Sequence, residues 1–228
     1  MNKSILIKKQ KNELYYNEFP HHLVVYHDVF HPSLLEEVAQ ITQSLTWFHS
    51  HYDSAKRQKP TGAVFTFSNA IESSKQAEQF KLSKEKELIE FRAMLDEIDN
   101  TILEILNHDY PDFPLTTENH HEYRLQNLIN WFMSHEVPLM HSDNGILTVL
   151  TPYVLNTLDY ELFNSRGETD FIVPGQSHLI STLPRNGDVV VFSGQIQHRG
   201  NGCADDIRRY SYVSTYAHPN HFNNHKKK

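Results

Sequence analysis

Short apolar runs and one proline mark the first elements of the chain. Leu23 to Tyr26 are consecutive apolar residues, which favours a β-strand over 23–26. Pro32 follows, and its fixed φ and missing N–H suit the first turn of a helix. Beyond it, apolar residues recur at helical spacing, at Leu34, Val38, Ile41 and Leu45. The pattern therefore predicts a strand and then a helix that begins at Pro32.

A second, longer helical pattern begins near Ser83 and ends before Pro111. Its apolar residues are spaced by alternating steps of three and four, at Leu88, Phe91, Leu95, Ile98, Ile102 and Ile105. That spacing gathers them into a single stripe along the helix. We expect this stripe to pack against a sheet.

After Pro114 the pattern changes to short apolar runs separated by turn-forming residues such as Asp143-Asn144-Gly145. The runs cover 123–133, 137–141, 146–155, 171–173, 178–182, 188–192 and 208–216. Many short strands in series indicate an antiparallel sandwich or a jelly roll. We expect a mostly β fold with flanking helices, of the α+β class, in one domain over 1–228. Within it, 1–114 would form a mixed helical support, 115–218 a jelly-roll core and 219–228 a flexible tail.

Charge and cysteine content narrow the functional classes. The net charge is −7, a sign that does not attract phosphate backbones, so we expect no nucleic-acid partner. Cys203 is the single cysteine, which excludes an intrachain disulfide and suits a reducing compartment. The sequence contains no secretion signal and no apolar run as long as a membrane span. We therefore expect a cytoplasmic protein with no membrane partner, and the oligomeric state stays open.

A His-x-Asp pair stands at the end of one predicted strand, as His141-Ser142-Asp143. Residues two apart in a strand point to the same face, so this imidazole and carboxylate would converge on one point. Such a pair carries little weight by itself, because His51-Tyr52-Asp53 is a second example. The surrounding sequence has to decide between the two.

The later pair has a third candidate ligand in His198. The predicted strand 188–192 runs through Ser193-Gly194 towards this histidine. Together His141, Asp143 and His198 would form a two-histidine, one-carboxylate face, which leaves iron positions open for a cosubstrate and oxygen. The earlier pair has only His108 as a counterpart, and this residue follows the helical stripe rather than a strand.

An arginine and a serine follow the third candidate ligand. Arg209 and Ser211 stand two apart on the last predicted strand, about ten positions after His198, so both side chains could face one pocket. A guanidinium matches a carboxylate in a bidentate way, and the hydroxyl adds a donor. Arg208 is the rival anchor, but the Arg-x-Ser spacing favours Arg209.

These motifs resemble the Fe(II)/2-oxoglutarate-dependent dioxygenases, specifically the prolyl-4-hydroxylase-like branch. The resemblance covers roughly residues 123–216. It rests on the His141-x-Asp143 pair, the strand 153–156, the segment from Gly187 to Phe192, His198 and Arg209-Tyr210-Ser211. The resemblance implies a double-stranded β-helix (jelly roll) core.

The same resemblance implies the cofactors and the reaction. Fe(II) would be held by His141, Asp143 and His198, and 2-oxoglutarate by Arg209 with Ser211 and Tyr153. With O2 as oxidant, the enzyme would hydroxylate an unactivated C–H bond of a small molecule, such as an amino acid or a natural-product intermediate, or of a protein residue, and release succinate and CO2. Two alternatives remain, a cupin-like metalloenzyme without 2-oxoglutarate and a non-catalytic β-sandwich binding module.

Overall fold

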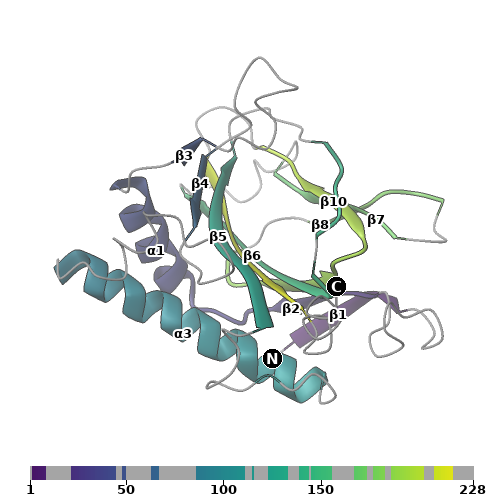
Figure 1. Ribbon diagram of the computed structural model, residues 1–228, viewed down its shortest axis with the longest axis horizontal. Helices are drawn as coiled ribbons and strands as arrows, with labels where there is room; N and C mark the ends of the chain where they lie inside the picture. The colour runs from purple at the N-terminus through teal and green to yellow at the C-terminus, as the bar shows by residue number, and fades with distance from the viewer. Residues whose placement is uncertain are drawn as a thin grey trace, which may run out of the picture.

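Two antiparallel sheets face each other in the computed structural model, and helices cover the outer face of the larger sheet (Figure 1). The structure describes residues 2–8, 22–44, 48–49, 63–66, 86–110, 115, 123–132, 139–143, 145–155, 167–173, 177–182, 186–202 and 208–217. Together the two sheets form the jelly roll that the run of short strands predicts.

The larger sheet has eight strands in the order β1-β2-β9-β6-β11-β5-β4-β3. Their bounds are Asn2–Lys8, His22–His27, Val189–Ser193, Leu147–Leu155, Arg208–Tyr216, Arg124–Phe132, Ala63–Thr66 and Phe48–His49, in sheet order. Strands from the first third of the chain thus pair with strands from the last third, because β2 lies beside β9.

The smaller sheet has the strand order β10-β7-β8, with bounds Gln197–Gly200, Thr169–Ile172 and Ile180–Thr182. His141 extends it on the open side of β10 through an isolated bridge to His198. In Figure 1 this sheet lies on the side of the larger sheet away from the helices.

Two helices pack on the outer face of the larger sheet, α1 over Pro32–Ser44 and α3 over Lys86–Asp109. The buried face of α3 includes Phe91, Leu95, Ile98, Ile102 and Ile105, as the apolar stripe predicts. Among the described residues, no helix is long and apolar enough to cross a membrane.

Alternation along β11 separates the two sides of the larger sheet. Tyr210, Tyr212 and Tyr216 belong to the core shared with the helices. Val213 packs in the second core, which lies between the sheets with Phe171 and Phe192. Because neighbouring strand residues point to opposite faces, Arg209 and Ser211 share the inner side with Val213.

The predicted elements agree with the structure except at several short strands. The prediction of a strand over 137–141 is wrong where the structure describes it, because 139 and 140 have no strand pairing and His141 makes only the single bridge. The strands β1, β3, β4 and β10 were not predicted. β3 and β10 have few apolar residues, and the apolar runs of β1 and β4 are only three residues long, so a pattern-based prediction has little signal there.

Candidate metal centre

Three side chains bring ligand atoms together at one edge of the small sheet. Atoms of His141, Asp143 and His198 all lie within 4.8 Å of one another. His198 Nε2 lies 3.7 Å from Asp143 Oδ2, and the rings of His141 and His198 have centroids 4.5 Å apart. His198 is buried and His141 is exposed, so the cluster opens to solvent on one side.

Backbone hydrogen bonds hold the two ligand-bearing segments against each other. His141 N donates to His198 O at 3.0 Å, and His198 N donates to His141 O at 2.8 Å. Asp143 N donates to Gly194 O at 2.8 Å. The pair His141 and Asp143 is thus positioned by its partners in β10 and in the β9–β10 turn, and not by a regular strand of its own.

Two glycines allow these segments to approach. A Cβ on Gly194 would stand 2.2 Å from the backbone oxygen of Gly145, and one on Gly145 would stand 2.3 Å from the Thr215 side chain. Contacts this short are not tolerated by folded backbone. The glycines therefore keep the turn that holds Asp143 close to the start of β6.

Hydrogen bonds at the ring nitrogens orient both histidines. Nδ1 of His141 lies 3.2 Å from Leu139 O, and Nδ1 of His198 lies 3.1 Å from Ile196 O. A carbonyl only accepts, so each Nδ1 carries the proton and each Nε2 keeps a lone pair. That tautomer is the one that binds a metal through Nε2.

The carboxylate has its own support in β6. Thr148 Oγ1 donates to Asp143 Oδ2 at 2.5 Å. Thr148 is fully buried on the inner side of the sheet, in register with Thr215 of β11. The hydroxyl therefore fixes the orientation of Asp143, and the oxygen that it binds is also the one that lies 3.7 Å from His198 Nε2.

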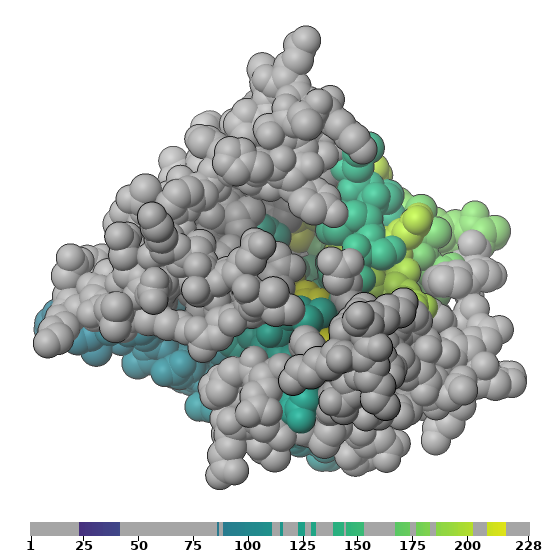
Figure 2. Space-filling model, in the orientation of Figure 1, coloured from purple at the N-terminus to yellow at the C-terminus, as the bar shows by residue number. Residues whose placement is uncertain are grey.

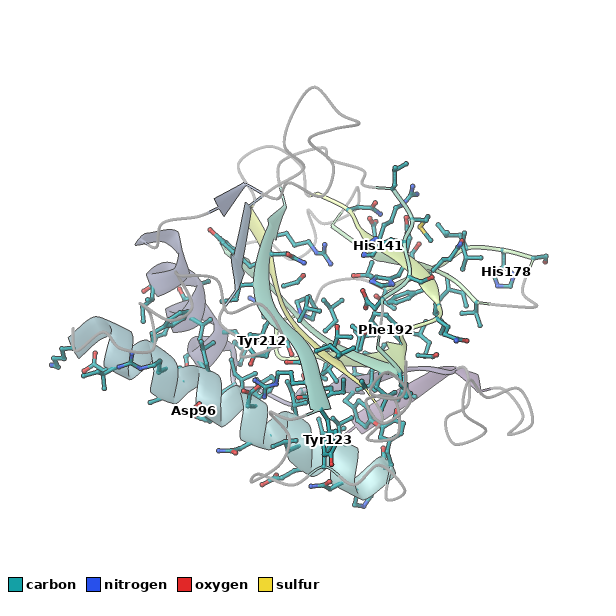
Figure 3. The ribbon with its side chains drawn as sticks, viewed as in Figure 1. Asp96, Tyr123, His141, His178, Phe192 and Tyr212 are labelled. Atoms are coloured by element: carbon teal, nitrogen blue, oxygen red, sulfur yellow. The ribbon has the colours of Figure 1, made fainter. Side chains whose placement is uncertain are left out.

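Aromatic packing surrounds the buried histidine. Phe192 meets His198 edge-on at 4.7 Å between ring centroids, and Phe171 stacks at 6.2 Å. Figure 3 shows His141 and Phe192 towards the small sheet and Tyr212 on the helix side of the large sheet. Burial lowers the pKa of His198. The charge of Asp143 raises this pKa and the nearby His141 lowers it, and the net shift is downward. The imidazole therefore stays neutral and available as a ligand.

Arg209 and Ser211 lie on β11 inside the jelly roll, and both are fully buried. Arg209 Nη2 donates to Thr169 Oγ1 at 2.7 Å and Nη1 donates to Asn201 O at 3.3 Å, so the side chain reaches across to the small sheet. Among the described residues, Ser211 Oγ makes no hydrogen bond. In Figure 2 atoms of β11, in yellow, are visible near the middle of the view.

The structure thus brings His141, Asp143 and His198 together and places Arg209 and Ser211 on one inner face. Tyr153 pairs in register with Tyr210, whereas Arg209 pairs with Val154. The side chains of Tyr153 and Arg208 lie outside the described residues, as does the rival pair of His51 and Asp53. Their suggested roles remain predictions.

The residues that support the site are not evident from the sequence. Thr148 holds Asp143, and Asp170 and Asn201 belong to the hydrogen bonds around Arg209. A polar residue in an apolar strand, as Thr148 is in β6, is a weak signal of this kind. Asp170 and Asn201 stand 31 residues apart, so no local pattern connects them.

No protein-family model and no curated protein matches the sequence, but solved structures match the fold. A prolyl hydroxylase from Trichoplax adhaerens, in complex with a hypoxia inducible factor oxygen degradation domain peptide fragment, aligns with TM-score 0.56 and 14% identity over 92% of this chain and 88% of that chain. The dioxygenase for auxin oxidation 1 of Arabidopsis thaliana, in a 2-oxoglutarate binary complex, gives 0.56 and 13% over 92% and 88%. A Pseudomonas putida prolyl-4-hydroxylase gives 0.52 and 10% over 86% and 93%. The chain therefore has the fold of these two prolyl hydroxylases and of this dioxygenase.

Proposed function

We propose that the chain is an Fe(II)- and 2-oxoglutarate-dependent oxygenase that hydroxylates an unactivated C–H bond. The carrying observation is that His141, Asp143 and His198 converge at the open edge of the small sheet, in a fold shared with such enzymes. The overall reaction converts the C–H bond, O2 and 2-oxoglutarate into the hydroxylated product, succinate and CO2.

The donor set suits Fe(II). Two imidazoles and one carboxylate on one face are the ligand set of non-haem iron oxygenases, and three such ligands leave positions for a cosubstrate and O2. Both histidines offer Nε2 because their Nδ1 atoms point at backbone carbonyls. When bound, the iron would supply the activation of O2 and the oxidation of the C–H bond.

The inner face of β11 suits the distal carboxylate of 2-oxoglutarate. Arg209 offers a planar fork of N–H donors, and Ser211 offers a buried hydroxyl that makes no hydrogen bond to the described residues. A buried hydroxyl without an acceptor is unfavourable, so a bound carboxylate would satisfy it. Arg209 and Ser211 would therefore hold and orient the cosubstrate.

The substrate class is a small molecule or a peptide residue. Two matched structures differ in this respect, because one contains a peptide fragment and another is named for auxin oxidation. The exposed side of the metal cluster, at His141, is where either substrate would meet the iron. The aromatic rings of Phe171 and Phe192 pack against His198, which is buried.

An assay of succinate release tests the proposal. The protein is incubated with Fe(II), 2-oxoglutarate, O2 and pools of amino acids, metabolites and peptides, and Asp143→Gly serves as the matched inactive control. We expect iron-dependent succinate and an equal amount of hydroxylated product in at least one pool. Stoichiometric metal binding with neither 2-oxoglutarate binding nor succinate would favour the cupin-like alternative, and absence of metal binding would favour a non-catalytic binding module.

A further inference from the structure

A buried aspartate in the small sheet accepts hydrogen bonds from three residues in two other segments. Asp170 of β7 accepts from Ser181 Oγ at 2.6 Å, from Arg199 Nε at 2.9 Å and from Asn201 Nδ2 at 2.9 Å. Burial alone would raise the pKa of Asp170, but these donors outweigh it and the pKa is lowered. Asp170 is therefore a fixed negative charge at the centre of a network.

One arm of this network leads to Arg209. Asn201 is held at its side chain by Asp170 and at its backbone N–H by Glu168 O, at 2.9 Å. Its carbonyl then accepts from Arg209 Nη1 at 3.3 Å. Thr169, the chain neighbour of Asp170, accepts from Arg209 Nη2 at 2.7 Å. One acceptor of the Arg209 N–H groups thus belongs to Asn201, which Asp170 holds, and the other belongs to Thr169, which is next to Asp170 in the chain.

We propose that Asp170 and Asn201 are positioning residues that aim the Arg209 guanidinium at the distal carboxylate of 2-oxoglutarate. Neither residue needs to touch the cosubstrate. The inference rests on the proposed function for the identity of that ligand, and on the hydrogen bonds above for the arrangement of Arg209.

The physical need for such a support follows from the shape of arginine. Its side chain is long and rich in rotamers, and a bidentate contact requires the planar fork to lie in one orientation. The hydrogen bonds from Nη1 to Asn201 O and from Nη2 to Thr169 Oγ1 fix the plane of the guanidinium. Displacement of binding groups by a small distance is enough to weaken a bidentate contact considerably.

Asp170 also connects this anchor to the metal centre. Arg199, the neighbour of His198, pairs in register with Asp170, and its side chain donates to the same Oδ2 that binds Asn201. The residue pair His198 and Phe171 lies next along the same ladder. The Asp170 carboxylate therefore binds both Arg199, next to the candidate metal ligand His198, and Asn201, whose carbonyl binds Arg209.

The first experiment measures the affinity of 2-oxoglutarate for the Mn(II)-loaded protein by calorimetry. Asn201→Ala removes the side-chain donor and keeps the backbone carbonyl, and Asp170→Ala removes the acceptor. We expect each to raise the dissociation constant of 2-oxoglutarate on the order of 10-fold. The double variant should be no weaker than Asp170→Ala, because both changes break the same link. The dissociation constant of Mn(II) should stay unchanged.

Ser181→Ala is the matched control. It removes a hydrogen bond to the other oxygen of Asp170 and leaves the Asn201 contact intact. We expect less than about a two-fold change in 2-oxoglutarate affinity. Equal weakening by Ser181→Ala and Asn201→Ala, or unchanged affinity in Asn201→Ala, would overturn the proposal. If Asp170→Ala does not fold, the comparison of Asn201→Ala with Ser181→Ala decides the question.

A second readout needs neither metal nor cosubstrate. The Nε–H resonance of Arg209 in the metal-free protein is assigned by its loss in Arg209→Lys, and its solvent exchange is measured. We expect slow exchange in the wild type and in Ser181→Ala, and faster exchange in Asn201→Ala. Unchanged exchange in Asn201→Ala contradicts the positioning role. If the wild type binds no 2-oxoglutarate but exchange is faster in Asn201→Ala, the positioning role is supported and the proposed function fails.

Discussion

At the scale of single residues, the candidate metal centre combines predicted ligands with supports that the sequence does not reveal. His141, Asp143 and His198 could be named because the residue types and their spacing match a known donor set. Their geometry arises differently from the expected strand, through the bridge between His141 and His198 and the contact of Asp143 with Gly194. Long-range hydrogen bonds of this kind leave no trace in a local pattern.

The three ligand candidates lead to a direct prediction on metal binding. His141→Ala or His198→Ala removes one of the two imidazoles, so stoichiometric binding of Mn(II) or Fe(II) should be lost. His178→Ala serves as the control, because His178 is exposed and points away from the cluster (Figure 3). Equilibrium dialysis with metal analysis measures the occupancy. Full occupancy in the His198 variant would show that the site lies elsewhere.

The approach of Gly194 to Gly145 leads to a second prediction. Gly194→Ala places a Cβ about 2 Å from a backbone oxygen, which cannot move without shifting the turn that holds Asp143. We expect a loss of about 1–3 kcal/mol in the free energy of unfolding and weaker Mn(II) binding. Denaturant unfolding and metal titration provide the two values. Wild-type values for both would mean that the turn adjusts freely and does not position Asp143.

At the scale of elements, periodicity predicts the long helices and strands and misses the short polar ones. The helix α3 and the strands β5, β6 and β11 have enough alternating apolar residues to be found. By contrast, β10 has four residues, Gln197–Gly200, and only one of them is buried. The same strand contains His198, so the sequence indicates this candidate ligand but not the strand in which it lies.

The attachment of α3 to the sheet gives a prediction at this scale. The Tyr212 hydroxyl donates to Asp99 Oδ1, and Arg124 Nη2 donates to Asp99 Oδ2 at 2.7 Å. Burial, with the negative charge of Asp99, raises the pKa of Tyr212, so the hydroxyl remains a donor. Tyr212→Phe should therefore lower the free energy of unfolding by about 1–3 kcal/mol, because Asp99 loses a buried partner.

Denaturant unfolding at neutral pH measures this loss. Thr101→Ala is the control, because Thr101 Oγ1 makes a solvent-exposed hydrogen bond to Glu97 O on the same helix. Its effect should stay within about 0.5 kcal/mol. An equal effect of both variants would indicate that the buried contact adds no stability beyond a surface hydrogen bond.

At the scale of the whole molecule, the jelly roll places the candidate metal ligands and the proposed carboxylate anchor, Arg209, on two facing sheets. His198 belongs to the small sheet, and Arg209 belongs to the large sheet but donates to Thr169 of the small one. We propose that a molecule with a chelating end and a carboxylate at its other end would be bound by these two groups. This arrangement is the basis for assigning 2-oxoglutarate as cosubstrate.

The most direct test is a titration of 2-oxoglutarate into the anaerobic Fe(II)-loaded protein. We expect saturable binding to the wild type and loss of binding in His198→Ala. Arg209→Ala should retain Fe(II) and bind 2-oxoglutarate about 30-fold or more weakly, because a charge-assisted contact worth about 2–5 kcal/mol is removed. Arg208→Ala should have a much smaller effect. Absence of saturable binding to the Fe(II)-loaded wild type would contradict the account.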